Sequence, residues 1–567
     1  SKAIVFLIFT TFLILSFTGT YTTLHAISAT LFLVLFIAVV FYDLRMVNKK
    51  RELENRIKFN SDEIKTLQHE FNFREDGSTF AKLNPHLSGD FDIFGAGSLY
   101  QYLNRSTTIR GKSRFAASLV ACNLNHEIIN SRTESIKELS NIPRFIEDFA
   151  VIGAEIKESG SEIDNLLKWL KTDNTKEPFI NAIRFVIPTI TFVILGLCIA
   201  GYLPYTLLSL TFISSLVVVF ANNKKLNKAH ALLGRSAKIL DKYSLLIELI
   251  ENTDFNSEAL KEEKQKLSTL EKTASKSIQK LKGILNRFDY RCDAYISVAL
   301  NGFLLFDFHT YTALLKWKTN HQDTVEQWFD AVTQVDSLIG LGIYAHNCKE
   351  ETCYAEVVEG DFNIKAQNMS HPLISLDVRV SNSMKISGRP AVVIITGANM
   401  AGKSTFLRTL AANLILGMNG APVCAEKFVF TPTKILSSIK IQDSLMNRES
   451  YFYAELLRLS NILESTKTEP QSMIILDEIL RGTNTKDKQQ GSLGLLRKII
   501  KQQGVVIIAT HDLIIGKMEE EFPDYVSNFC FEVEIDGELL SFDYKLKNGI
   551  SSKLNASFLM RRMGIID

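Results

Sequence analysis

The pattern of apolar positions singles out the start of the chain. Two nearly charge-free runs, residues 3–17 and 24–42, are joined there by a short polar stretch. About 20 apolar residues cross a bilayer, and somewhat shorter runs are accommodated by local thinning. We therefore predict a transmembrane helical hairpin over residues 1–43. The alternative for the first run is the apolar region of a signal peptide, but no small-residue cleavage site follows it cleanly and a second span comes at once.

A second apolar pair lies in the middle of the chain. Residues 185–202 and 205–221 are separated by a short turn, which predicts a second transmembrane hairpin over residues 179–222. The alternative is a hairpin buried in the core of a helical domain, because the polar residues Asn181 and Arg184 stand at its start. The length and apolar character of both runs favour the membrane.

Positive charge indicates the orientation of both hairpins. Lysine and arginine follow each hairpin, whereas the turns inside the hairpins are uncharged. Short basic flanks stay on the cytoplasmic side. We predict a multi-pass protein of the cytoplasmic membrane, with four transmembrane helices in contact with lipid and the rest of the chain, its C-terminal domain included, in the cytoplasm. The basic residues are Arg45, Lys49, Lys50, Arg51, Arg56 and Lys58 after the first hairpin, and Lys224, Lys225, Lys228, Arg235 and Lys238 after the second.

The segments on either side of the second hairpin are charged and helix-prone. Residues 44–178 and 223–369 are predicted to form the two parts of a helical core. In the second part, Leu267, Ile278 and Leu281 belong to a series of apolar residues at helical spacing, without proline. Strand-like patches appear only toward its end.

The C-terminal third alternates differently. Three short apolar runs, residues 391–395, 473–476 and 505–509, alternate with helical patterns. Buried strands that alternate with helices are typical of an α/β layer with a parallel sheet. Residues 370–567 are therefore predicted to form an α/β domain.

The amino-acid composition excludes some classes of protein but does not indicate a function. Hydrophobic residues make up 46% and charged residues 22% of the chain, which excludes wholesale disorder. The net charge of +2 gives no overall sign of a nucleic-acid partner, although a local basic patch stays open. Seven scattered cysteines do not form a secreted disulfide framework. Cys348, Cys353 and His346 lie close together but lack further ligands at zinc-finger spacing, so we interpret the cysteines as ordinary thiols.

A phosphate-binding loop follows the first apolar strand of the α/β domain. Residues 397–405 fit the pattern G-x-x-x-x-G-K-[ST] between a strand and a helix. The backbone N–H groups of such a loop wrap phosphates, Lys403 supplies a cation to the β and γ oxygens, and the Ser404 hydroxyl binds Mg²⁺. ATP and Mg²⁺ are the expected cofactors. The candidate cofactor-binding residues here are Gly397, Asn399, Gly402, Lys403, Ser404 and Thr405.

The other two apolar strands also end in polar residues. Asp477 follows the second strand and is expected to join Ser404 in the magnesium shell, while the adjacent Glu478 orients and deprotonates the attacking water. The third strand ends before His511, which would lie beside the γ-phosphate. Lys403, Glu478 and His511 are therefore candidate catalytic residues.

These motifs and their surroundings resemble the ATPase domain of the MutS proteins, the DNA mismatch-repair clamps. Residues 396–416 read TGANMAGKSTFLRTLAANLIL, similar to TGPNMGGKST in the family. Residues 449–456 read ESYFYAEL, similar to STF-x-x-E-M, and residues 476–487 read LDEILRGTNTKD, similar to DE-x-GRGT. ATHD at residues 509–512 matches the family's ATH switch.

The resemblance implies the fold and one further site residue. It is strong over about residues 370–565 and weaker over residues 92–105, which are similar to the start of the family's helical core. The implied fold class is α + α/β, a helical MutS-like core with two transmembrane hairpins, followed by a C-terminal ABC-type P-loop ATPase domain. His371 stands at the position of the family's entry to the nucleotide domain and is added to the cofactor-binding residues.

The resemblance also implies a homodimer. In ABC-type ATPases, a serine at a helix start between the phosphate loop and the acidic pair contacts the γ-phosphate bound by the other protomer. Ser450 is the candidate for this role and completes the expected catalytic set. Leu480 stands where the family has glycine and Tyr451 where it has threonine. Neither departure removes a catalytic group, so ATP hydrolysis is expected.

Two functions follow from the resemblance and from the departures. No counterpart of the N-terminal mismatch-reading domain is expected, because a membrane hairpin and the helical core follow directly. The hairpin at residues 179–222 falls about where the family inserts the lever and clamp that close around DNA. The first hypothesis is a membrane-anchored MutS-family ATPase, an ATP-gated dimer that binds mismatched or branched DNA in a repair-related role. The second is an ATP-driven membrane machine or scaffold whose dimer closure moves the hairpins without DNA.

Overall fold

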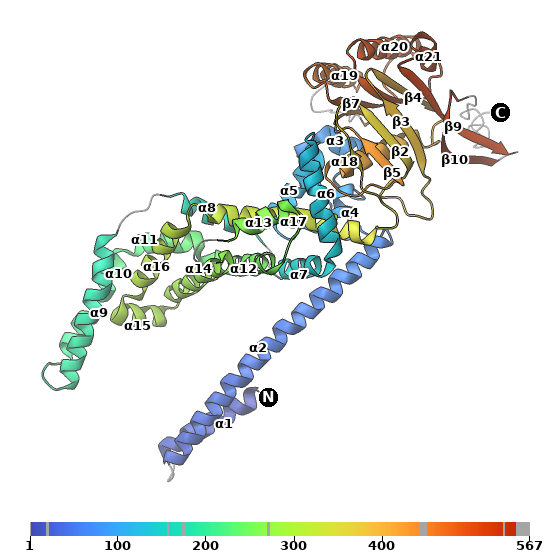
Figure 1. The fold of residues 1–567 in the computed structure, drawn as a ribbon. Coiled ribbons are helices and arrows are strands. Elements are labelled where there is room, and N and C mark those ends of the chain that lie inside the picture. Colours follow the sequence, from blue (N-terminus) through green and yellow to red (C-terminus); the bar gives the residue numbers. More distant parts are fainter. Residues whose placement is uncertain are drawn as a thin grey trace. The chain divides into compact units, whose positions relative to one another are not determined.

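A computed structural model describes residues 2–18, 22–155, 158–172, 177–268, 273–440, 451–536 and 539–551. The chain divides into two compact units, residues 1–64 and 65–567. Figure 1 shows the helices and strands of both units. The first unit contains only helices, whereas the second combines a helical part with an α/β part.

The first unit is a helical hairpin. α1 (Lys2–Thr18) and α2 (Thr22–Leu67) lie antiparallel, and the ring of Phe12 stacks on that of Phe32 with the centroids 5.6 Å apart. α2 does not end with its apolar run. It continues as one helix of 46 residues into the charged residues beyond residue 43.

The helical part of the second unit is organised around α17. This helix is buried over most of its length and contacts α5, α6, α7, α12 and α13. On α17, Asp336 accepts hydrogen bonds from the backbone N–H groups of Thr107 and Thr108, both at 2.9 Å, and so fixes the chain at the start of α5. The helices are α3 (Pro85–Asp90), α4 (Leu99–Leu103), α5 (Ile109–Val120), α6 (His126–Asn141), α7 (Pro143–Ala154), α8 (Glu162–Leu170), α9 (Pro178–Ile199), α10 (Thr206–Ala221), α11 (Asn223–Leu233), α12 (Ala237–Asn252), α13 (Glu258–Lys266), α14 (Ala274–Phe288), α15 (Ala294–Leu304), α16 (Phe306–His321) and α17 (Val325–Asn347).

The apolar helices differ in how well they fit a membrane. Within the described residues, α2 and α9 are long and apolar enough to cross one, and up to four spans result if each of two bent helix pairs counts as one. The bent pairs are α10 with α11, at 61°, and α15 with α16, at 84°. α1, with 17 residues, is a shorter apolar helix. The four predicted spans coincide in position with α1, α2, α9 and α10, whereas α15 was not predicted.

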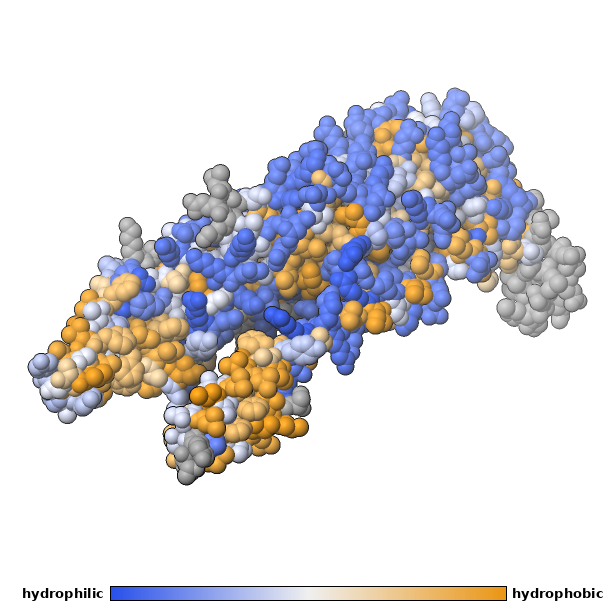
Figure 2. Space-filling model, turned by 60° about the horizontal axis from the view of Figure 1, so that its bottom comes forward, coloured by the Kyte–Doolittle hydropathy of each residue, from blue (hydrophilic) through white to orange (hydrophobic). Residues whose placement is uncertain are grey.

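Most of the large apolar side chains of α9 and α10 are exposed. Figure 2 shows hydrophobic residues gathered on the surface of this region, and only 17% of the most apolar window of α9 is buried. The alternative of a hairpin buried in a helical core is therefore wrong. The exposed large apolar residues of the two helices are Phe179, Phe185, Val186, Ile190, Phe192, Val193, Leu197, Ile199, Leu207, Leu210, Ile213, Val217 and Phe220.

The α/β part is built on a six-stranded sheet in the order β10-β9-β4-β8-β7-β6. The inner pairs are parallel, and β10 is antiparallel to β9. Parallel strands bury both faces, and β4, β7 and β8 are buried at every position. The strands are β4 (Ala391–Gly397), β6 (Lys434–Ser438), β7 (Ser472–Asp477), β8 (Val505–Thr510), β9 (Val526–Asp536) and β10 (Leu539–Asn548).

A smaller sheet, in the order β1-β5-β2-β3, accompanies the first. β2 pairs antiparallel with both β3 and β5, while β1 is parallel to β5. Two of these strands precede residue 370, the boundary that the sequence predicts. The strands are β1 (Glu356–Val357), β2 (Asn363–Met369), β3 (Asn382–Ser387) and β5 (Lys427–Phe430).

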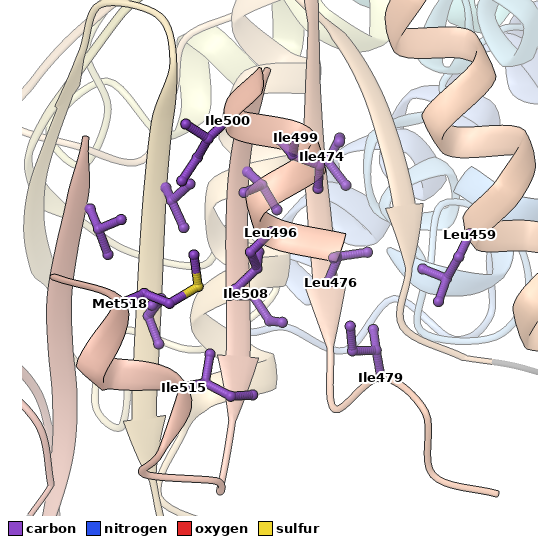
Figure 3. Close-up of a cluster of buried hydrophobic side chains, with 14 of the residues drawn as sticks. Leu459, Ile474, Leu476, Ile479, Leu496, Ile499, Ile500, Ile508, Ile515 and Met518 are labelled. Atoms are coloured by element: carbon purple, nitrogen blue, oxygen red, sulfur yellow. The ribbon is translucent and has the colours of Figure 1, made fainter. Parts of the chain in front are cut away.

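Helices pack on the large sheet through aliphatic side chains. Figure 3 shows the cluster in which isoleucines and leucines of β7 and β8 meet Leu496 and Ile499 of α20, Leu459 of α19 and Met518 of α21. This packing holds the strand ends that carry the candidate site. The helices of the α/β part are α18 (Lys403–Met418), α19 (Tyr451–Thr468), α20 (Thr485–Lys501) and α21 (Met518–Glu521).

Asp90, at the end of α3, connects the helical part to the α/β part. Its carboxylate accepts hydrogen bonds from the backbone N–H groups of Lys440 (2.8 Å) and Ile439 (3.3 Å), and it pairs with Arg458 of α19. Its backbone oxygen accepts a hydrogen bond from Arg408 of α18 at 3.1 Å. One buried aspartate therefore joins α3 to three elements around the phosphate loop.

Candidate nucleotide site

The glycine loop between β4 and α18 depends on two glycines. Gly397 has φ +151°, and a Cβ there would lie 2.7 Å from the backbone oxygen of Phe531. Gly402 has φ +106°, and its Cβ would lie 3.1 Å from the ring of Tyr544. Side chains are excluded at both positions, which leaves the backbone of the loop free to approach a ligand at the N-terminus of α18.

The loop borders a cavity of about 460 Å³. Six of the predicted cofactor-binding residues line it, together with Glu478: they are His371, Asn399, Gly402, Lys403, Ser404 and Thr405. Three further predicted residues, Gly397, Asp477 and His511, do not line it but contact residues that do, through the interactions given below. The structure therefore gathers the described candidate residues at one place.

Lys403 lies at the bottom of the cavity. Its ammonium donates hydrogen bonds to the backbone oxygens of Gly397 (2.7 Å) and Ala398 (2.8 Å), and it lies 4.0 Å from Oε1 of Glu478. Burial lowers the pKa of Lys403, while Glu478 and Asp477 act in the opposite direction. The two carboxylates thus favour the charged form of a buried lysine.

Ser404 and Asp477 offer oxygen ligands for a divalent cation. The Ser404 hydroxyl donates to Oδ2 of Asp477 at 2.5 Å. Burial raises the pKa of Asp477, and this hydrogen bond opposes the rise. Mg²⁺ prefers oxygen ligands and usually binds through one or two carboxylates and substrate phosphates. Among the described residues, no group of three or more His, Cys, Asp or Glu side chains gathers to hold a metal, so a site of this sparse kind fits the residues that are present.

Glu478 is surrounded by basic groups. Its Oε1 lies 3.4 Å from Nδ1 of His511, and its Oε2 lies 3.5 Å from Arg481. The residue has φ +47°, in the left-handed region, and its N–H donates to the backbone oxygen of Ala509 at 2.9 Å. A strained backbone held by a neighbouring strand aims this carboxylate toward the cavity.

Glu455 holds the segment that follows Glu478, a role that the sequence did not reveal. Its carboxylate accepts hydrogen bonds from the backbone N–H groups of Leu480 (2.6 Å) and Arg481 (3.3 Å). Burial raises the pKa of Glu455, and these two bonds oppose the rise. Leu480 has φ +59°, a conformation that favours glycine and that explains why the MutS family has glycine at this position. Glu455 lies in the segment ESYFYAEL, which resembles a MutS segment, but the sequence assigns this glutamate no role.

His371 forms part of the cavity wall as a neutral group. Burial and the nearby Arg408 lower its pKa to about 4, despite the opposing charge of Asp92. The backbone N–H of Leu373 donates to Nδ1 at 3.2 Å, so the proton of the neutral ring is assigned to Nε2. His371 can therefore contribute a hydrogen bond but no charge near pH 7.

The outer wall of the cavity comes from residues that no motif predicts. Tyr544 of β10 and Asn382 of β3 both line it. The side chain of Asn382 donates to the backbone oxygen of Tyr544 at 3.0 Å and accepts from the N–H of Leu546 at 2.7 Å. This pair of bonds holds the last strand against the cavity.

Ser450 lies outside the described residues. The described part of α19 begins at Tyr451, the next residue along the chain. Its relation to a second protomer stays a prediction.

The described geometry suits the binding and hydrolysis of a nucleoside triphosphate. The backbone N–H groups of a glycine loop at a helix N-terminus bind phosphate, and a buried ammonium adds a positive charge. A hydroxyl and a carboxylate at 2.5 Å can share a divalent cation. A carboxylate 3.4 Å from an imidazole can accept a proton from water and pass it on.

Comparison with known proteins agrees with this geometry. Residues 393–559 match MutS domain V. The DNA mismatch repair protein MutS of Carboxydothermus hydrogenoformans is 30% identical over 252 residues, 43% of this chain and 29% of that protein. The protein of the same name from Persephonella marina is 32% identical over 212 residues, 37% of this chain and 24% of that protein. The chain thus spans less than a third of the length of each relative. This C-terminal part of the chain is therefore related to the MutS family.

Proposed function

We propose that this protein is a MutS-type ATPase that binds ATP and Mg²⁺ in the cavity beside the glycine loop and is anchored in a membrane by its apolar helices. The observation that carries the proposal is the meeting of Lys403, the Ser404–Asp477 pair and Glu478 at the edge of one parallel sheet. MutS proteins are ATPases in general, which supports the same conclusion.

Each residue has a task in hydrolysis. Lys403 balances the negative charge that grows on the transferred phosphoryl group, and Ser404 and Asp477 would hold Mg²⁺, which would supply further positive charge there. Glu478 orients a water molecule and accepts its proton, while His511, 3.4 Å away, keeps the carboxylate in place and can donate to the phosphoryl group.

Replacing Glu478 should separate binding from hydrolysis. Glu478→Gln should bind ATP normally and hydrolyse it at least ~100-fold more slowly, the scale expected on loss of a general base. Lys403→Ala should abolish nucleotide binding. Both are measured with purified protein, by fluorescent-nucleotide binding and phosphate release. Normal turnover in the glutamine variant would remove Glu478 from its proposed role.

Glu455 should act on the rate without touching the nucleotide. Glu455→Gln loses one acceptor for the N–H groups of Leu480 and Arg481, so the segment after Glu478 shifts, and a small misplacement can cost ~10-fold or more in kcat. We expect ATP affinity to change little. Glu464→Gln, at an exposed position of the same helix, is the matched control and should behave as wild type. An equal loss of affinity and rate would instead indicate general disruption.

The proposed enzyme is a homodimer in which Ser450 completes the partner's site. Ser450→Ala should then hydrolyse ATP slowly but bind it, and mixing it with Lys403→Ala should restore part of the activity, because one hybrid site has an intact loop and an intact serine. Mixing Lys403→Ala with Glu478→Gln changes the same side of the site, since the two residues lie 4.0 Å apart, and should restore nothing. Absence of recovery in the first mixture at every ratio would overturn the shared site.

The family relationship suggests a mismatch-repair-like role, and DNA is the corresponding partner. The relatives are named DNA mismatch repair proteins. One observation favours the second function, a membrane machine or scaffold that does not use DNA. α9 and α10, about where the family inserts lever and clamp, expose apolar side chains, which suit lipid and not the phosphates of a duplex. Basic residues beside these helices are explained by topology and anionic lipid.

DNA binding separates the two functions. Binding of duplex, mismatched and branched DNA by the detergent-purified protein is measured over a salt series. Phosphate contacts give an affinity that falls steeply with salt, and a repair role adds a preference for mismatched or branched DNA. Weak binding with no preference would leave the membrane machine as the function.

A further inference from the structure

The short helix α15 has an open apolar side that no other part of the described chain covers. Its sequence, AYISVALNGFL, contains no charged residue. Tyr295 is 90% exposed and Val298 48% exposed, and Ile296 and Leu304 are exposed as well. An exposed apolar surface of this kind usually marks a site that contacts lipid or another protein.

The C-terminal turn of α15 packs on the apolar hairpin. The rings of Phe303 and of Phe212 on α10 meet edge to face, with their centroids 5.0 Å apart. Gly302 makes this close approach workable, because a Cβ there would lie 2.1 Å from the ring of Phe212. α15 also contacts α9. Its open side therefore continues the exposed apolar surface of α9 and α10 (Figure 2).

Polar contacts join the two ends of α15. Arg291, just before the helix, and Asp307, just after it, form a buried ion pair with Nε and Oδ2 3.8 Å apart. Arg291 also donates to the side chain of Asn223, at the start of α11, at 2.7 Å. After Asp307, the ring of His309 bonds the backbone oxygen of Arg184 at 2.8 Å. Since the two ends are tied together, the segment cannot cross a bilayer from one side to the other.

The backbone turns sharply at the end of α15, as it must if the chain is to return toward the start of the helix. Leu305 adopts the left-handed conformation, φ 49° and ψ 44°, and α16 leaves at 84° to α15. With 11 residues, α15 is about 16 Å long, roughly half of a 30 Å hydrocarbon layer. The polar side chain of Asn301 is satisfied within the protein, because it accepts from the N–H of Asp307 at 2.9 Å and donates to Ser297 at 3.2 Å.

We propose that α15 is a re-entrant helix, which dips into the same leaflet that the cytoplasmic halves of α9 and α10 cross and contacts lipid acyl chains with its open side. The proposal rests on the membrane anchoring proposed above and adds an element to it. Non-helical backbone at membrane depth is tolerated where it is buried in protein, and Leu305 is buried.

Photo-crosslinking to lipid tests the proposal. A photoreactive amino acid is placed at Val298 in the full chain, which is reconstituted in phosphatidylcholine–phosphatidylglycerol bilayers, and lipid adducts are identified by mass spectrometry. Val217 on α10, 60% exposed, is the membrane control, and Ile128 on α6, 51% exposed, is the control for an apolar residue away from the hairpin. We expect lipid adducts at Val298 and Val217 and none at Ile128.

The other outcomes are distinguishable. Adducts at Val217 without adducts at Val298 would overturn the re-entrant helix and leave membrane anchoring intact. Adducts at neither position would overturn the anchoring itself. Crosslinks from Val298 to a second copy of the chain would show that the open side of α15 faces protein, which also overturns the proposal. Equal adducts at all three positions would mean that labelling follows exposure alone, and the lipid contact would again be rejected.

Discussion

The candidate site depends on a constraint of the parallel sheet, namely that neighbouring strands end at the same edge. The register pairs Thr396 of β4 with Thr510 of β8, and Ala509 of β8 with Asp477 of β7. Whatever follows each strand is therefore delivered to one place, although the three segments are far apart in the sequence. The strand order and register alone bring the glycine loop, the acidic pair and His511 together. The aliphatic packing of α19 and α20 on the sheet keeps the strand ends in position.

This constraint explains which site residues could be predicted. Lys403 follows β4 through the glycine loop, Asp477 ends β7 and His511 comes directly after β8, so a local pattern and the rule for parallel strands place them together. Glu455 and Tyr544 could not be placed in this way. Glu455 acts because α19 packs its side chain under the backbone of a distant segment, and Tyr544 reaches the cavity because β10 is added antiparallel at the sheet edge and bonded to β3. The positions of Glu455 and Tyr544 in the site are determined by tertiary contacts, which produce no periodic pattern in the local sequence.

The same distinction applies to the helices. The runs at residues 24–42 and 185–202 are long enough for hydropathy alone to identify them, and they fall on α2 and α9. α15 has only 11 residues and is flanked by Arg291 and Asp307, so its composition merges with a charged, helical stretch. The exposure of its apolar residues becomes evident only when the structure shows which part of α15 packs on α10. Likewise, the change from apolar to charged residues near residue 43 marks no break in the backbone, because α2 continues through it.

A packed path connects the nucleotide site to the apolar helices within the second unit. Arg408, on the helix that carries Lys403, bonds the backbone oxygen of Asp90 and pairs with Asp92 at 3.5 Å. From there, α18 contacts α5, α5 contacts α17, α17 contacts α12, and the path continues through α14 and α16 to α9. Protein interiors are close-packed, so a rearrangement around the phosphate loop is passed on to neighbours instead of being absorbed in voids. Under the proposed function, these contacts are the route by which a rearrangement at the candidate nucleotide site would reach α9 and α10, whether or not the protein also binds DNA.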